Sequence, residues 1–228
     1  MAGGGSTITL PILIFMGLEG SLANGTNRVA IVIQNIFAIV SFRQEKYYKF
    51  KTGLKLAAFA LPGAIAGAIL ATSISNELFQ KILAYVLIGV IISMLAKKSN
   101  QKEPKDSQHH QSSWYIYPVM LVVGFYGGFI QAGVGFLFMA FLYHLMKLNL
   151  VQVNMHKVFI ILIYTIPALF VFLFTNNVDW KFGIVLAAGN SLGAWWSAKL
   201  SVKKGEKAIR IILMVAILMM ALKLLGVF

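Results

Sequence analysis

Two short polar stretches hold the side chains of this sequence that could bind a small anion. Asn27-Arg28 in the first half corresponds to His156-Lys157 in the second half, 129 residues later. Each pair places a hydrogen-bonding side chain and a cation just before an apolar stretch. If both cations face inward, they would meet near an axis between the halves and suit a small divalent oxyanion. The alternative is that they extend towards lipid headgroups, as long cations near helix ends often do.

Glycine-rich stretches form a second group of candidate binding elements. Gly3 to Thr7 opens the chain, and Gly127-Gly128 and Gly133-Val134-Gly135 interrupt the corresponding region of the second half. A helix that starts after such a break directs free N–H groups and its positive end into a cavity, which favours an anion. Close helix packing through small residues is the alternative, and we expect it at Gly63, Gly67 and Gly193.

The candidate binding set combines backbone amides with side-chain donors. Gln131 belongs to it because it lies in apolar surroundings beside a glycine break, although a helix-to-helix hydrogen bond would also satisfy its amide. The set is Gly4, Gly5, Ser6, Asn27, Arg28, Gln131, Gly133, Gly135, His156 and Lys157.

The residue types argue against enzyme chemistry. The chain has no Cys, and it shows no Ser/His/Asp set, no paired carboxylates and no metal-ligand spacing. We therefore expect no catalytic residue, no metal and no cofactor. The net charge of +13 could indicate nucleic acid, but Lys- and Arg-rich cytoplasmic loops of a membrane protein explain it more simply.

The elements that must position these residues are apolar runs of membrane-spanning type. Hydrophobic residues make up 59% of the 228 residues and charged residues 12%, about half the usual charged share of soluble domains. Helices are the expected form, because only helices and closed barrels satisfy their backbone in lipid. The runs cover residues 8–23, 29–42, 53–71, 78–95, 115–131, 136–148, 158–174, 182–200 and 209–227.

An internal repeat divides the chain. Tyr48–Leu70 aligns without gaps to Val178–Leu200, 130 residues later, with nine of 23 positions identical. A polar linker, residues 97–113, lies between the halves. We therefore predict a first membrane repeat over 1–96, a cytoplasmic linker over 97–113 and a second membrane repeat over 114–228.

The loop charges indicate that the two copies are inverted. Residues 43–51 hold four cations and their counterpart, 175–181, holds one, whereas 199–210 is basic and its counterpart, 72–81, holds one. Under the positive-inside rule this reversal places the copies in opposite orientations. All Lys and Arg then fall on or near the cytoplasmic side except Arg28, Lys81, Lys181 and Lys223.

The expected fold is all-α: a polytopic transmembrane helix bundle of two inverted repeats with glycine-broken or re-entrant helices. Many secondary transporters have this architecture, with sites near the midplane at the repeat interface. The step from architecture to transport is an inference by analogy.

At the glycine-rich and polar stretches that hold the candidate residues, the sequence resembles the TauE/SafE-type sulfite exporter family of membrane transporters. The matching features are short motifs in a specific order. They are Gly3-Gly4-Gly5 with Ile8-Thr9-Leu10-Pro11, Gly25-Thr26-Asn27-Arg28, Gly124 to Phe129, Gly133-Val134-Gly135-Phe136 and Val178-Asp179-Trp180.

The resemblance implies a multi-pass carrier of the bacterial inner membrane that moves sulfite or small organosulfur anions, and proton coupling is compatible with it. The second unit has a helix, about 115–131, before its glycine break, and an equivalent is expected before Gly3, where the numbered sequence starts at Met1. Either the start of the protein lies upstream of the numbered sequence or the element is absent. If that element is absent, the first half of the site is incomplete.

Three functions stay open on the sequence alone. A secondary carrier for a small sulfur-containing anion is the first, an anion channel on the same scaffold the second, and a structural or assembly membrane protein the third. The inverted repeat argues against the third. The expected partners are a small anion and the lipid bilayer, with no nucleic acid, and a homodimer is compatible with the sequence.

The predicted orientation has a direct test in the linker. The chain has no native Cys, so Asn100→Cys introduces a single thiol. A membrane-impermeant maleimide should label it only from the cytoplasmic side. Labelling from the periplasmic side would reverse the assigned topology.

Overall fold

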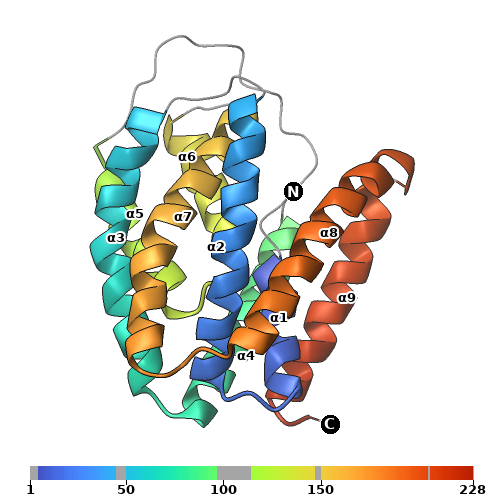
Figure 1. Cartoon of the computed structure of the whole chain (residues 1–228). Coiled ribbons are helices and arrows are strands. Elements are labelled where there is room, and N and C mark those ends of the chain that lie inside the picture. Colours follow the sequence, from blue (N-terminus) through green and yellow to red (C-terminus); the bar gives the residue numbers. More distant parts are fainter. Residues whose placement is uncertain (1–4, 45–49, 97–113, 147–149, 205, 228) are drawn as a thin grey trace.

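A computed structural model describes residues 5–44, 50–96, 114–146, 150–204 and 206–227, and these form helices with no strand among them. The predicted all-helical class is therefore confirmed. The helices, drawn in Figure 1, are α1 Gly5–Phe15, α2 Gly20–Gln44, α3 Phe50–Ser73, α4 Asn76–Ala96, α5 Ile116–Phe129, α6 Val134–Met146, α7 Leu150–Phe174, α8 Trp180–Lys204 and α9 Glu206–Leu224.

The bundle is that of a multi-pass membrane protein. Apolar side chains are widely exposed on its outer surface, for example Val185, which is 71% exposed. Such a surface suits lipid and not water. Four segments of the described helices are long and apolar enough to cross a bilayer: Gly20–Phe42, Lys51–Ser73, Asn76–Leu95 and Gln152–Phe174.

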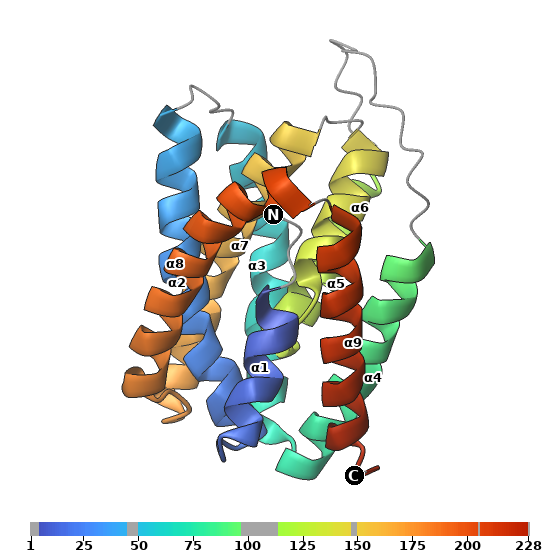
Figure 2. The same cartoon turned by 90° about the vertical axis from the view of Figure 1, so that its right-hand side faces the viewer.

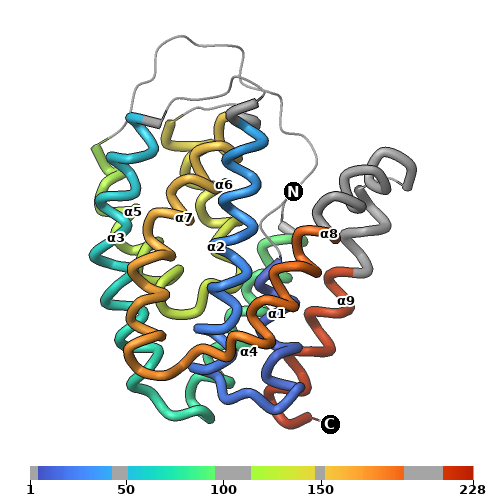
Figure 3. The backbone as a smooth tube through the Cα atoms, in the orientation of Figure 1, coloured from blue at the N-terminus to red at the C-terminus, as the bar shows by residue number. Residues whose placement is uncertain are grey.

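Three shorter helices surround the glycine breaks. With 11, 14 and 13 residues, α1, α5 and α6 are too short to cross a hydrocarbon core of about 30 Å at about 1.5 Å per residue. The backbone trace in Figure 3 shows α5 turning back into α6 part-way through the bundle. In Figure 2, α1 and α6 leave the middle of the bundle in opposite directions. The predicted glycine break is present between α5 and α6, at Gly133. Of the break predicted at the start of the first unit, Gly3 and Gly4 lie outside the described residues, and Gly5 to Thr7 are helical.

Helices of the two halves recur at a constant spacing. The first residues of α2 and α7 (Gly20 and Leu150) are 130 residues apart, as are those of α3 and α8 and those of α4 and α9. The members of the first two pairs run in opposite directions in Figure 1, and α4 and α9 do so in Figure 2. Opposite directions are what an inverted duplication would produce, and that origin stays a prediction.

Close backbone contact joins α3 to α5. A Cβ added to Gly63 or Gly67 would lie 2.1 Å from the carbonyl oxygen of Leu121 or Phe125, and one added to Gly124 would lie 2.1 Å from that of Ala60. The two helices therefore touch through glycines spaced four residues apart, as in other membrane helix pairs. The packing role predicted for Gly63 and Gly67 is confirmed, while the side chain of Gly193 lies outside the described residues.

The apolar run over 8–23 is interrupted, as the glycines within it indicate: the chain turns at Gly17 with φ +98° before α2 begins at Gly20. One sequence-based boundary is wrong. Asn27-Arg28 and His156-Lys157 do not precede helices but lie inside α2 and α7. A helix can continue through such residues when distant parts of the chain satisfy their polar groups.

The α3–α5 contact gives the first stability prediction. Gly63→Ala should force the two backbones apart and lower the free energy of unfolding by about 1–3 kcal/mol, the usual range for overpacking. The matched control is Gly89→Ala in α4, where an added Cβ meets nothing within 4 Å, so it should leave stability equal or raise it by up to about 1 kcal/mol. Thermal unfolding of the detergent-solubilised protein compares the two, and equal melting temperatures would contradict the account.

Candidate functional site

Arg28 is the centre of the polar cluster inside the bundle. Its side chain is fully buried. One terminal nitrogen, Nη1, donates to Oε1 of Gln131 at 3.1 Å, while Nη2 donates to the carbonyl oxygens of Gly127, at 3.1 Å, and Gly128. The guanidinium therefore joins α2 of the first half to the end of α5 and to the turn after it.

The end of α5 provides acceptors that suit a cation. The last carbonyls of a helix have no partner within the helix and carry its partial negative charge. Gly127 and Gly128 lie in the final turn of α5, and the planar fork of an arginine can bond several such oxygens at once. The ring of Phe172 on α7 completes the surroundings, with its centroid 4.8 Å from the guanidinium carbon. Arg28 thus satisfies a helix end that lies inside the bundle.

The turn after α5 is held in an unusual backbone conformation. Gln131 has φ +66° and Gly133 has φ +73°; the first is rare for a residue with a side chain. The side chain of Gln131 bonds Arg28, and the hydroxyl of Tyr126 donates to the carbonyl of Ala132. Gly133 admits no Cβ, which would lie 2.5 Å from Cγ2 of Val90 on α4. Surrounding contacts therefore fix this turn.

The glycine break expected at Gly127-Gly128 is wrong. Both residues are helical, and a Cβ added to Gly128 would lie 2.0 Å from the carbonyl oxygen of Ala64. Their small size serves helix packing and leaves their carbonyls open to Arg28. The break lies later, at residues 130–133.

The starts of α1 and α6 are close together. A Cβ added to Gly133 would lie 3.7 Å from Cγ2 of Thr7 in the first turns of α1. Asn27 joins α2 to α1, because its Oδ1 accepts a hydrogen bond of 2.8 Å from the hydroxyl of Thr9. The structure therefore brings α1, which begins at Gly5 and Ser6, near the break that leads through Gly133 to Gly135 in α6. Gly4 lies outside the described residues.

Polar capacity remains unused in this cluster. Among the described residues, Nε of Arg28, Nδ2 of Asn27 and Oδ1 of Asn24 are buried without a hydrogen-bond partner. Unpaired buried polar atoms are rare in proteins and often mark a functional site. These atoms lie on adjacent turns of α2, so a small polar ligand could reach more than one of them.

The charge of Arg28 has no carboxylate partner in the described part of the chain. The guanidinium contacts two backbone carbonyls, an amide oxygen and an aromatic ring. The one salt bridge among the described residues is the exposed pair Lys81–Glu77, at 2.6 Å. Dipoles alone therefore surround a buried positive charge, and an anion would be attracted to it. The described residues contain no group of three His, Asp or Glu side chains that could hold a metal ion.

The corresponding residues of the second half have their own contacts. His156 and Lys157 are both buried, at 2% and 4% exposure. Nζ of Lys157 donates to Oδ1 of Asn154 at 2.6 Å and lies 3.9 Å from Sδ of Met139. The terminal nitrogens of Arg28 contact Gln131 and the end of α5. That both cations bind one anion stays a prediction.

Several residues of the cluster escaped the candidate set. Asn24 belongs to the same polar stretch of the sequence as Asn27 and Arg28 but is not in the candidate set; it donates from Nδ2 to the carbonyl of Phe129 at 2.7 Å and lies four residues before Arg28, on the same helix face. That spacing was a usable signal. Nothing in the sequence indicated that Phe172 would lie under the guanidinium, or that Tyr126 would bond the break.

Comparison with known proteins identifies the fold family. The family described as "Sulfite exporter TauE/SafE" matches residues 1–224. The chain belongs to the TauE/SafE sulfite exporter family. The motifs that suggested the resemblance include the Arg28 stretch and the glycine break described above.

Curated TauE/SafE-like relatives carry transporter names. The chain is 29% identical over 228 residues to "Probable membrane transporter protein ORF9" of a Sinorhizobium species, covering 99% of this chain and 86% of that protein. It is 27% identical over 229 residues to "Probable membrane transporter protein YfcA" of Escherichia coli K12, covering 99% and 83%. The chain is therefore a membrane transporter by family. No solved structure matches it significantly.

The geometry around Arg28 predicts a large effect from a change that keeps its charge. Arg28→Lys cannot bond Gln131, Gly127 and Gly128 together, so buried acceptors lose their donors, at about 1–3 kcal/mol each. We expect lower thermal stability in detergent. Lys81→Met, which removes an exposed ion pair, should change stability by less than about 1 kcal/mol. Equal stability of Arg28→Lys and wild type would show that the fork contacts are dispensable.

Proposed function

We propose that this protein is a secondary carrier that moves a small sulfur-containing anion, of the sulfite or organosulfonate type, across the bacterial inner membrane by alternating access. The observation that supports the proposal most is the buried guanidinium of Arg28, which contacts dipoles and, among the residues that the structure describes, no carboxylate. The family supports the transport role, and its description as a sulfite exporter family supports sulfite-like cargo.

The electrostatics favour an anion over a cation or a neutral solute. A buried positive charge is unfavourable unless a partner compensates it. Helix starts add partial positive charge, and those of α1 and α6 lie close to Gly133. A small oxyanion would compensate the buried positive charge and accept hydrogen bonds at the helix starts, because it offers negative charge and several acceptor oxygens.

Each candidate residue has a role in this proposal. Backbone amides at the two helix starts, from Gly4, Gly5, Ser6, Gly133 and Gly135, would bind the anion's oxygens. Asn27 and Arg28 would donate through Nδ2 and Nε, which are unpartnered among the described residues. Gln131 would hold Arg28 in place and donate from its own amide, while His156 and Lys157 would approach from the second half.

Alternating access would follow from the two inverted halves. In such transporters one repeat or bundle rocks against the other around a central site. The pairs α2 and α7, and α3 and α8, run in opposite directions here. No step in this cycle requires bond chemistry, so we propose that the protein is not an enzyme.

Transport assays in proteoliposomes test the carrier directly. Radiolabelled sulfite, sulfate, thiosulfate and taurine are offered to the reconstituted full chain. At least one should show saturable flux, with turnover far below channel conductance. Absence of flux for all four would reject the sulfur-anion assignment, and non-saturating conductance would favour an anion channel on the same scaffold.

The proposed role of Lys157 makes a further prediction. Lys157→Ala should raise the apparent KM for the transported anion at least about tenfold, the effect of losing roughly 1.4 kcal/mol of binding. Lys181→Ala is the matched control, because Lys181 is an exposed cation at the start of α8. Flux and KM measured side by side decide the matter. An unchanged KM in Lys157→Ala would remove this residue from the site.

A further inference from the structure

Two buried hydroxyl groups on α7 lie outside the candidate set. The side chains of Tyr164 and Thr165 are fully buried. Among the described residues, neither hydroxyl has a hydrogen-bond partner. An unpaired polar group inside a protein is rare and unfavourable. Two such groups on neighbouring residues therefore indicate a place where a polar ligand binds.

The hydroxyl of Thr165 does not take the partner that a helix usually offers. A hydroxyl inside a helix can donate to a carbonyl three or four residues earlier. Thr72 in α3 and Ser191 in α8 do so, at 2.9 and 2.8 Å. Thr165 makes no such bond, so its hydroxyl is available to a ligand.

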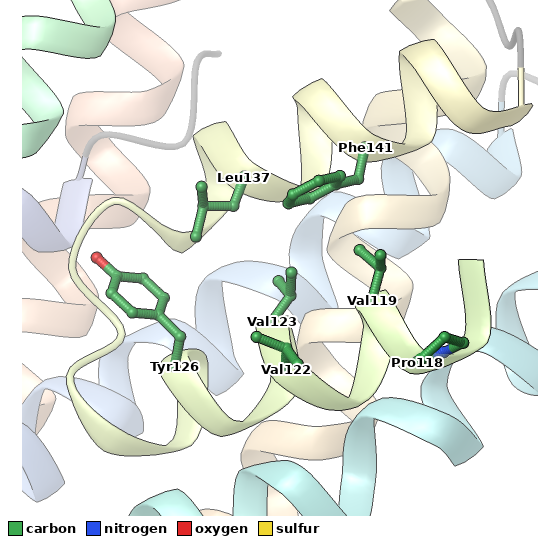
Figure 4. Close-up of a pocket in the computed structure, with 7 residues that line it drawn as sticks. All are labelled: Pro118, Val119, Val122, Val123, Tyr126, Leu137 and Phe141. Atoms are coloured by element: carbon green, nitrogen blue, oxygen red, sulfur yellow. The ribbon is translucent and has the colours of Figure 1, made fainter. Parts of the chain in front are cut away.

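Tyr126 shows the contrasting case of a tyrosine with a bonded hydroxyl. Figure 4 shows its ring at the turn between α5 and α6, and its hydroxyl donates to the carbonyl of Ala132. The ring of Tyr164 is also held in place, because it stacks on Phe138 of α6 with centroids 6.0 Å apart. Its hydroxyl, unlike that of Tyr126, has no partner among the described residues. Tyr126 therefore fixes the turn, whereas the hydroxyl of Tyr164 needs another explanation.

The hydroxyl of Tyr164 lies beside the Arg28 cluster. A Cβ added to Gly127 would lie 2.5 Å from this hydroxyl, and the carbonyl of Gly127 accepts from Nη2 of Arg28 at 3.1 Å. The side chains of Gln131 and Thr165 lie close to the hydroxyl, although neither bonds it with acceptable geometry. Both hydroxyls of α7 are therefore next to the buried positive charge and the glutamine that holds it.

We propose that Tyr164 and Thr165 bind the transported anion by donating their hydroxyl hydrogens to its oxygens. The inference rests on the proposed function and adds two residues to its site. Arg28 supplies the positive charge, so these donors need none of their own. Hydrogen bonds from hydroxyls to an anion are short and strong. Two fixed donors also favour a ligand with at least two acceptor oxygens, because a poorer ligand leaves a buried hydroxyl unpaired.

These two residues would join the anion to both halves of the protein. Arg28 and Asn27 belong to α2 of the first half, whereas Tyr164 and Thr165 belong to α7 of the second. A site between the halves is what alternating access requires. Lys157 lies seven residues before Tyr164 on α7, about 10 Å along the helix. The role of the hydroxyls therefore does not depend on the role of Lys157.

Substitutions that keep the side-chain shape test the inference. The purified full chain in lipid nanodiscs is incubated separately with radiolabelled sulfite, sulfate, thiosulfate and taurine. For the anion that binds, Tyr164→Phe and Thr165→Val should each lower affinity at least about tenfold, because each loses a hydrogen bond to a charged group. Thr165→Ser keeps its hydroxyl and Tyr85→Phe changes an exposed residue of α4, so both should bind within about twofold of wild type.

The binding results separate the inference from the proposed function. Unchanged affinity in Tyr164→Phe or in Thr165→Val would remove that residue from the site, and unchanged affinity in both would overturn the inference while leaving the carrier intact. No binding of any of the four anions to the wild type would overturn the inference and the sulfur-anion assignment together.

Thermal unfolding separates binding from a structural role. Without anion, Tyr164→Phe should melt at the same temperature as wild type or higher, because the hydroxyl that it removes has no partner in the described part of the chain. Tyr126→Phe should melt lower, since it loses the bond to Ala132. Added anion should raise the melting temperature of wild type more than that of Tyr164→Phe. A lower melting temperature of anion-free Tyr164→Phe would show that its hydroxyl stabilises the fold, and would overturn the inference.

Discussion

The bond between Arg28 and the end of α5 is the interaction on which the centre of this structure depends. A helix that ends inside a membrane leaves carbonyls that lipid cannot satisfy. A guanidinium placed inside a membrane needs acceptors. Here the guanidinium supplies hydrogen-bond donors to the helix end, and the helix end supplies acceptors to the guanidinium. Nη1 of Arg28 donates to Gln131, and Nη2 donates to Gly127 and Gly128. The chain can therefore turn back between α5 and α6 without exposing its backbone to lipid.

This arrangement constrains its neighbours. Glycines in α5 let this helix lie against the backbone of α3. That contact fixes the position of the end of α5, and therefore the position of the carbonyls that Arg28 bonds. The turn at 130–133 then directs α6 away from the break, close to the start of α1. Asn27, next to Arg28, ties α1 to α2 through Thr9. Elements far apart in the sequence are thus set by one buried polar cluster.

Part of this could be predicted from the sequence. Apolar runs indicated the helices, and the small residues Gly63 and Gly67 indicated close packing, because both signals are local. The continuation of α2 through Asn27 and Arg28 could not be predicted, since their partners lie about 100 residues away. For the same reason Gly127-Gly128 resembled a break: α3, the helix that requires small residues there, is distant in sequence. The positions of the predicted site residues relative to a bound anion stay a prediction.

The central proposal is that a buried positive charge, with no carboxylate partner in the described part of the chain, selects an anion as the cargo. The most direct measurement compares methanesulfonate with methanesulfonamide, a neutral molecule of similar shape, as competitors of radiolabelled sulfite uptake in proteoliposomes. The account predicts that methanesulfonate competes at least about a hundredfold better, because losing a charge-assisted contact in a buried site is worth roughly 3 kcal/mol. Equal competition by the neutral molecule would contradict it.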